Sequence, residues 1–386
     1  RGPVFCYATK RAPKRARPLS INQFPTHRHI RVLLRDMTTL YEPVTFGSTE
    51  LKNRIVMAPL TRTRADLDGT PNDLLVEHYR QRAGLGLIIA EGTWPTIEGR
   101  TWYNQPGIAT AAHRDAWQKV TDAVHTAGGK IFLQIMHGGR ISHEEITGTG
   151  RIVAPSAIAA PNPIRIKEGK APAPVPHALT AAEIGHIEDE FVQAAERAIA
   201  AGFDGIELHG ANGYLINQFF SPAANTRDDA YGVERSLFAT EVTNKVADAI
   251  GTDKVAIRLS PGQNIQGADE TDPEETARTY LTFARNIPRL AFLHVMNPDP
   301  ADSLVQELRR GQNLVLNTGF GTVTTKQDAE QIVAAGHAEA VSVGRRAMAN
   351  PDLAYRWENN LPENELNQAT VYGSGSEGYT DYPAYQ

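Results

Sequence analysis

The chain has 386 residues, of which 41% are hydrophobic, enough to form the core of one barrel-sized domain. It contains no run of eighteen apolar residues, and this excludes an ordinary transmembrane helix. Cys6 is the single cysteine, which excludes internal disulfides, CxxC zinc sites and cysteine-ligated iron–sulfur clusters. We therefore expect a cytoplasmic protein that has no metal site.

Charge divides the chain into a basic head and an acidic body. Residues 1–36 hold nine Lys or Arg against one acid, whereas residues 37–386 hold 30 basic and 43 acidic side chains. The acidic body disfavours nucleic acid as a partner. The head is poor in Ser, and prolines interrupt it, so a disordered extension or sequence upstream of a start at Met37 is favoured over a transit peptide. We expect a basic extension over 1–36 and one folded domain over 37–386.

From residue 54 onward, short runs rich in Val, Ile and Leu alternate with amphipathic stretches. The runs predict strands over 54–59, 85–92, 130–137, 204–210, 254–260, 289–296, 313–319 and 339–344. Helices are predicted over stretches that include 113–128, 181–202 and 325–336, with helix C-caps near Gly128, Gly202, Gly251 and Gly336. Eight such units predict a parallel, closed (β/α)8 barrel of the TIM type. A doubly wound sheet is the alternative, but no glycine-rich dinucleotide turn follows an early strand.

Two segments depart from this repeat. Residues 41–53 predict a small hairpin that closes the bottom of the barrel. An insertion of roughly forty residues separates the third strand from its helix and includes the Pro-rich stretch 171–180. An insertion this long at the catalytic face predicts a lid or rim.

The active site of such a barrel lies at the carboxyl ends of its strands. Gly319 and Gly344 end the seventh and eighth predicted strands, and the loops at these places often bind phosphate through backbone amides. Arg345 would add a charged fork for the phosphate. The alternative is that both glycines only end strands and that Arg345 is a surface residue.

Gln134 and Arg258 are predicted to point into the barrel. A buried cation needs an anionic partner, and a buried amide needs both a donor and an acceptor. An isoalloxazine ring offers both, through its uracil-like edge and through the N1/O2 region that becomes anionic on reduction. For Arg258, an ion pair with a core acid such as Glu207 is the alternative.

The segment DGIELHGANGYL (204–215) places three polar residues just after a strand-like run. His209 shares a strand face with Glu207, opposite Ile206 and Leu208, so it faces the barrel mouth if this apolar pair faces the helices. His209 and Asn212 are suited to hold one oxygen, and Tyr214 is a proton donor at neutral pH. This set suits an α,β-unsaturated carbonyl. A satisfied core histidine at a capped strand end is the alternative.

Five motifs within residues 38–386 closely resemble the Old Yellow Enzyme family of FMN-dependent ene-reductases. They are MAPLTRTRA, QIMHGGRIS, GFDGIELHGANGYLINQFF, SVGRRAMANPDL and GSEGYTDYP. The bacterial branch that includes glycerol trinitrate reductase looks nearest. The resemblance implies non-covalent FMN, NADPH or NADH as hydride donor, and ping-pong transfer from flavin N5 to activated alkenes such as enones and nitroalkenes. Nitrate esters are further expected substrates.

The same resemblance implies roles for individual residues. FMN contacts would fall on Pro59, Leu60, Thr61, Gly92, Gln134, Arg258, Thr318, Gly319, Gly344 and Arg345. The substrate oxygen would be held by His209 and Asn212, the proton would come from Tyr214, and Trp102 stands at an aromatic pocket position. Two other functions are weighed against this one: a non-redox barrel lyase or isomerase that acts on a phosphorylated substrate with His209 as base, and a flavin-storing barrel.

Overall fold

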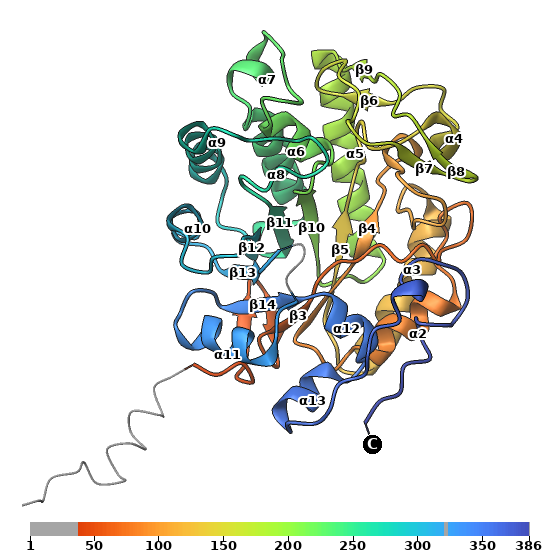
Figure 1. The fold of residues 1–386 in the computed structure, drawn as a ribbon, viewed down its shortest axis with the longest axis vertical. Helices are drawn as coiled ribbons and strands as arrows, with labels where there is room; N and C mark the ends of the chain where they lie inside the picture. The colour runs from red at the N-terminus through yellow and green to blue at the C-terminus, as the bar shows by residue number, and fades with distance from the viewer. Residues whose placement is uncertain (1–37, 320–322, 386) are drawn as a thin grey trace, which may run out of the picture. The chain divides into compact units, whose positions relative to one another are not determined.

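Eight parallel strands close into a barrel at the centre of the structure (Figure 1). The computed structural model describes residues 38–319 and 323–385. In barrel order the strands are β10 (Gly205–Gly210), β11 (Val255–Leu259), β12 (Phe292–Met296), β13 (Leu314–Asn317), β14 (Ala340–Val343), β3 (Ile55–Met57), β4 (Leu87–Thr93) and β5 (Ile131–Ile135). Each predicted strand corresponds to one of these, and β4 extends one residue further than predicted. The (β/α)8 prediction is confirmed, and the doubly wound alternative is wrong.

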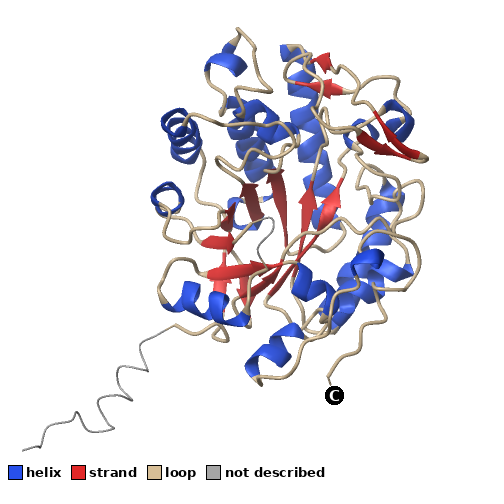
Figure 2. Cartoon of the chain, in the orientation of Figure 1, coloured by secondary structure: helices blue, strands red, loops and turns tan. Residues whose placement is uncertain are grey.

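Helices surround the barrel (Figure 2). Those that follow barrel strands are α2 (Asp73–Gln81), α3 (Ala111–Thr126), α5 (Ala181–Ala200), α8 (Leu237–Ile250), α9 (Pro273–Asn286), α10 (Ser303–Leu308), α11 (Lys326–Ala334), α12 (Arg345–Ala349) and α13 (Leu353–Glu358). Short helices lie in the loops: α4 (Glu144–Thr147), α6 (Leu215–Phe220), α7 (Ala230–Val233), and the 3-10 turns η1 (Ile97–Gly99), η2 (Thr252–Lys254) and η3 (Gln368–Thr370). Among the described residues, no helix is long and apolar enough to cross a membrane.

Local sequence signals set the ends of these helices. Thr180 begins α5 with a capping box, in which its hydroxyl accepts from the Glu183 amide while the Glu183 carboxylate accepts from the Thr180 amide. The four glycines predicted at C-caps all have positive φ, between +71° and +94°. That backbone conformation is cheap only for glycine, and so each helix ends where the sequence indicates.

The interior of the barrel is layered. Its lower part is apolar and contains Val56, Leu87, Ile89, Phe132, Ala256, Phe292, Val315 and Ala340. Side chains alternate along a strand, so the next inward residue lies two positions later. On five of these strands that residue is polar: Gln134, Arg258, His294, Asn317 and Ser342. Glu207 of β10 joins them, since it bonds to Gln134 and His294. The upper layer is therefore a polar floor beneath the carboxyl ends of the strands.

A hairpin of β1 (Val44–Phe46) and β2 (Thr49–Leu51) contributes to the apolar layer. Phe46 is fully buried, and its ring centroid lies 5.2 Å from that of Phe292. Burying such a ring contributes roughly 1.5–3 kcal/mol. The predicted closure of the barrel bottom by this hairpin is confirmed.

The insertion between β5 and α5 forms the predicted rim. It carries α4 and four short strands, β6 (Val153–Ala154), β7 (Ile164–Ile166), β8 (Gly169–Ala171) and β9 (His177–Ala178). They pair as an antiparallel β7–β8 hairpin and a parallel β6–β9 pair. Ile141, Ile146 and Ile164 of this rim form an apolar cluster with Tyr214, so the rim packs beside the predicted site.

The basic head and Met37 lie outside the described residues. From Thr38 onward the chain forms one compact unit. The predicted boundary at residue 37 stays a prediction.

Candidate active site

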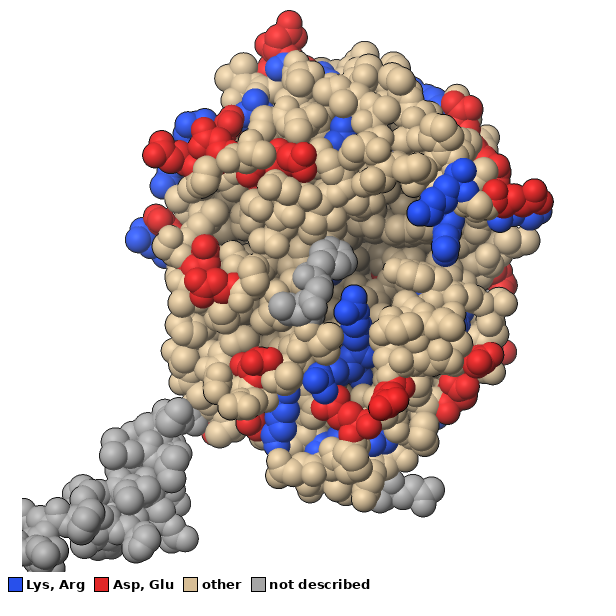
Figure 3. Space-filling model, viewed as in Figure 1, with Lys and Arg blue, Asp and Glu red and all other residues tan. Residues whose placement is uncertain are grey.

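A cavity of about 670 Å³ opens at the carboxyl ends of the barrel strands. Figure 3 shows a hollow near the centre of this face, with basic side chains beside it. Of the predicted site residues, those that line the cavity are Pro59, Leu60, Thr61, Trp102, Gln134, His209, Asn212, Tyr214, Arg258, Gly319, Gly344 and Arg345. Gly92 and Thr318 do not line it.

Gly92 lies behind side chains that do. A Cβ atom at this position would lie 2.8 Å from the sulfur of Met136 and 3.3 Å from Oε1 of Gln134. Glycine is therefore needed so that two lining side chains can pack against the strand. Thr318 shares a hydroxyl hydrogen bond of 2.8 Å with Thr324 and faces a neighbouring cavity.

The turn after β10 presents Asn212 to the cavity through an unusual backbone. Asn212 has φ +62° and Gly213 has φ +81°, so the chain is left-handed at two successive residues. The amide of Asn212 donates to the Ser260 hydroxyl at 3.0 Å, and its carbonyl accepts from Nε2 of Gln266 at 2.7 Å. The Gly213 amide donates to Oδ1 of Asn217 at 2.8 Å. Nε2 of Gln218 donates to the Gly213 carbonyl at 2.8 Å, so four hydrogen bonds from outside hold the turn.

His209 and Asn212 carry buried polar atoms that lack partners. Nδ1 of His209 and Oδ1 of Asn212 have no hydrogen-bond partner among the residues that the structure describes. Buried polar groups are normally hydrogen-bonded, so their partners are expected from a bound molecule or water. Burial, assisted by nearby Arg258, lowers the pKa of His209 well below its ordinary value, and the ring is neutral.

Tyr214 is the N-cap residue of α6 and is 8% exposed. Burial raises its pKa above the ordinary tyrosine value. Its ring lies edge-on to His209 at 4.9 Å and to Trp102 at 6.0 Å, measured between centroids. The phenol is therefore protonated at neutral pH and lies beside the His209 ring.

Arg258 lies between His209 and His294 in strand register and is 6% exposed. Glu207 contacts Gln134 and His294 rather than Arg258, so the ion pair offered as the alternative for Arg258 is wrong. Nε of Arg258 is buried without a partner in the described part of the chain. A buried cation at a cavity wall calls for an anionic or strongly polar group.

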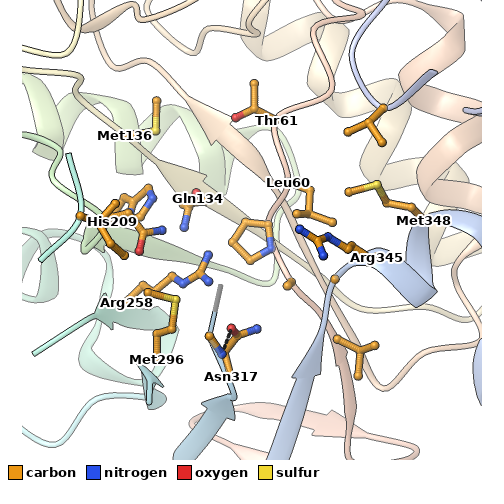
Figure 4. A pocket seen from close by; sticks show the side chains of 18 of the residues that line it. Leu60, Thr61, Gln134, Met136, His209, Arg258, Met296, Asn317, Arg345 and Met348 are labelled. Carbon is orange, nitrogen blue, oxygen red and sulfur yellow. Dashed lines mark hydrogen bonds between the residues drawn. The ribbon is translucent and has the colours of Figure 1, made fainter. Parts of the chain in front are cut away.

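Figure 4 shows Gln134 and Arg258 facing the same space, with Arg345 across from them. Gly319 has φ +98°, a backbone conformation that residues other than glycine rarely adopt. A Cβ atom at Gly344 would be in ordinary contact with Leu60 at 3.7 Å. At one end of the cavity, buried polar atoms have no partner among the described residues, and at the other end two glycines lie beside the exposed Arg345. This arrangement fits a flat polar ring that carries a phosphate.

Sequence reasoning missed several lining residues, which include Met296, Asn317, Met348 and two groups from loops. Ile265 and Gln266 come from the β11–α9 loop, and Leu366, Gln368, Val371 and Tyr372 come from the C-terminal segment. Arg64 holds that segment, since its guanidinium donates to the carbonyls of Thr370 at 2.8 Å and Glu377 at 2.9 Å. The sequence signals were the pair of arginines in TRTRA and the C-terminal motif GSEGYTDYP, which contains Glu377.

Comparison with known proteins gives consistent matches. The family model described as "NADH:flavin oxidoreductase / NADH oxidase family" matches residues 39–364. A probable flavin mononucleotide-dependent alkene reductase of Leishmania infantum is 41% identical over 361 residues, which cover 90% of this chain and 98% of that protein.

Solved structures agree with these matches. The old yellow enzyme homologue from Zymomonas mobilis superposes with a TM-score of 0.83 at 38% identity, covering 90% of this chain and 99% of its own. Morphinone reductase in complex with tetrahydroNAD has a TM-score of 0.83 at 37% identity and covers 90% and 98%. The bacterial branch suggested by the motifs stays a prediction. The chain belongs to the NADH:flavin oxidoreductase / NADH oxidase family and is an FMN-dependent oxidoreductase of the Old Yellow Enzyme type.

Proposed function

We propose that this protein reduces activated alkenes, namely α,β-unsaturated carbonyls and nitroalkenes, with NADPH or NADH as the hydride donor. The observation that carries the proposal is the grouping of His209, Asn212 and Tyr214 at one wall of the cavity. The name of the Leishmania relative, an alkene reductase, and the tetrahydroNAD bound to morphinone reductase support it. Nitrate esters are further substrates on the resemblance to nitrate-ester reductases.

Gln134, Arg258, Thr61 and Pro59 would hold the ring of FMN, and Gly319, Gly344 and Arg345 would hold its phosphate. FMN, when bound, supplies the chemistry of accepting a hydride from a nicotinamide and passing it on. Arg258 would hold a positive charge beside the ring and so would favour the uptake of electrons. Gly92 and Thr318, proposed from the resemblance as FMN contacts, would act through the lining residues beside them.

His209 and Asn212 would bind the carbonyl or nitro oxygen of the acceptor. Each can offer one N–H, and a neutral imidazole donates without adding a charge that repels Arg258. Two donors on one oxygen withdraw electrons from the conjugated alkene in the transition state. Tyr214 Oη would deliver a proton to the carbon next to the activating group, and Trp102 would pack against the substrate.

One cavity serves both reactants in this proposal, which implies ping-pong use by the nicotinamide and the alkene in turn. The lyase alternative is disfavoured by the family and by His209 itself. Its lowered pKa makes the ring a weak proton acceptor.

The test is the absorption spectrum of the purified protein. A flavin spectrum that NADPH or NADH bleaches, and that 2-cyclohexenone restores under anaerobic conditions, is expected. A colourless folded protein that takes up no FMN would favour the lyase, and a yellow protein that neither nicotinamide bleaches would favour flavin storage.

A further inference from the structure

A chain of hydrogen bonds crosses the polar floor of the barrel. Nε2 of Gln134 donates to Oε1 of Glu207 at 2.8 Å, and Nδ1 of His294 lies 2.7 Å from Oε2 of the same carboxylate. Nε2 of His294 lies 3.0 Å from the hydroxyl of Ser342, which accepts from Nδ2 of Asn317 at 3.0 Å. Gln134 and Asn317 line the cavity, whereas Glu207, His294 and Ser342 are fully buried beneath it.

The direction of each bond follows from chemistry. A carboxylate only accepts, so Gln134 must turn its NH2 group to Glu207 and its oxygen away from it. Burial lowers the pKa of His294, so the ring is neutral and has one N–H. That N–H points to Glu207, and Nε2 then accepts from the Ser342 hydroxyl. Every donor in the chain thus points toward Glu207.

Glu207 also lies near Arg258 in the barrel. Its strand neighbours in register are Gln134 on β5 and Ala256 on β11, two residues before Arg258. Burial lowers the pKa of Arg258, and Glu207 is the first of the groups that oppose this shift. A buried carboxylate is costly unless it is hydrogen-bonded, and here two donors satisfy it.

We propose that Glu207 is a positioning residue of the flavin site, which fixes the Gln134 amide with its oxygen toward the cavity and offsets part of the Arg258 charge. The proposal rests on the function proposed above. It assigns two separable effects to one side chain: the bond to Gln134 sets the affinity for FMN, and the negative charge sets the reduction potential.

Two substitutions separate these effects. Glu207→Gln keeps an oxygen that can accept from Gln134, while its NH2 group can donate to the other tautomer of His294, but it removes the charge. We expect the ratio of reduced to oxidised FMN to rise about tenfold at a given potential, an upward shift of about 30 mV for a two-electron couple.

Glu207→Asp keeps the charge, but its side chain is one methylene shorter. We expect it to bind FMN about tenfold more weakly, because a hydrogen bond to a charged group is lost, and to keep a potential close to that of the unmodified protein.

Glu188→Gln is the matched control. Glu188 is a buried glutamate on α5 whose partner is Lys245 at 2.9 Å, and it does not line the cavity. This variant should leave both the affinity and the potential unchanged.

Potentials are measured by anaerobic dye equilibration of the FMN-bound proteins. Affinities come from quenching of FMN fluorescence on titration into apoprotein, and circular dichroism checks the fold. An unchanged potential in Glu207→Gln, or an unchanged FMN affinity in Glu207→Asp, would overturn the proposal. If Glu207→Gln does not fold, the FMN affinity of Glu207→Asp tests the proposal by itself. A tenfold loss of that affinity supports the proposal.

Failure of the proposed function is a distinct result. A wild-type protein that binds FMN, with variants that behave as expected, but that reduces no alkene would overturn the function and leave the role of Glu207. An active alkene reductase whose two variants match the wild type would overturn only the role of Glu207.

Discussion

At the scale of single residues, the proposed mechanism separates oxygen binding from proton delivery. His209 and Asn212 have unpaired buried polar atoms among the described residues, while Tyr214 is a buried phenol beside them. The sequence predicted these three because they follow a strand end directly, where glycines allow the chain to turn. It could not predict that Glu207 bonds to Gln134 and His294 instead of Arg258, because alternation gives the face of a residue and not its partner.

Tyr214→Phe should slow enone reduction by roughly 10²–10⁴-fold, the usual contribution of a positioned general acid. It should leave reduction of FMN by NAD(P)H nearly intact, since that step needs no proton from Tyr214. A nitroalkene should suffer less, because its nitronate product can leave without being protonated. Stopped-flow kinetics of the two half-reactions measure these rates.

His209→Ala is the comparison. It should slow the reduction of both enones and nitroalkenes, because the contact with the substrate oxygen is lost. An unchanged enone rate in Tyr214→Phe would mean that water supplies the proton.

The pH dependence of the enone step tests the state of Tyr214. Burial raises its pKa, so the protonated acid persists above the ordinary tyrosine value of about 10. The rate of the enone half-reaction should therefore stay level as the pH passes through 10, provided that the protein stays folded. The nicotinamide half-reaction, recorded over the same range, corrects for other titrations. A fall in the enone step alone, centred at the ordinary tyrosine value, would contradict a buried phenol.

Arg258→Ala should lower the FMN potential or release the flavin. Loss of the cation removes a favourable interaction with the reduced, anionic ring, and a tenfold effect corresponds to about 30 mV for a two-electron couple. The sign is opposite to that expected for Glu207→Gln, and the two are compared in one dye-equilibration series. An unchanged potential with FMN fully bound would place the charge of Arg258 away from the ring.

At the scale of elements, the alternation of apolar runs with amphipathic stretches predicted each barrel strand. Buried strands appear in the sequence as apolar runs that end at glycine or at polar residues. The C-terminal segment left no such signal. Arg62 and Arg64 donate hydrogen bonds to backbone carbonyls of this segment, which lies more than 300 residues away in the sequence. Nη2 of Arg62, for example, lies 2.6 Å from the Gly378 carbonyl oxygen. Hydrogen bonds to backbone carbonyls are independent of side-chain identity, so no residue pattern in that segment marks them.

The turn after β10 leaves no room for a side chain at Gly213. Gly213 has φ +81°, and a Cβ there would lie 2.5 Å from the carbonyl oxygen of Ile265. Gly336 has φ +71° with nothing within 4 Å of a Cβ position, so it is a matched control for backbone strain alone. Gly336→Ala should cost about 1–2 kcal/mol of unfolding free energy. Gly213→Ala should cost more and should also reduce enone turnover, because it displaces Asn212. Urea denaturation and steady-state rates measure both, and equal costs would mean that the β11–α9 loop yields to the methyl group.

At the scale of the whole molecule, charge and pattern assign the folded domain to residues 37–386. The barrel, its bottom hairpin and its rim all lie within the compact unit that begins at Thr38. The cavity is lined by residues from Ala58 to Tyr372, so the residues proposed to hold FMN lie within that unit. The head carries nine basic residues and one acid, a balance of +8, in contrast to the acidic body of the chain.

We therefore expect a chain that begins at Met37 to fold, to bind FMN with the affinity of the full chain, and to unfold at the same temperature. Thermal unfolding and FMN titration of both chains check this in one buffer. A truncated chain that is insoluble or free of FMN, beside a sound full-length protein, would show that the head contributes to the folded state.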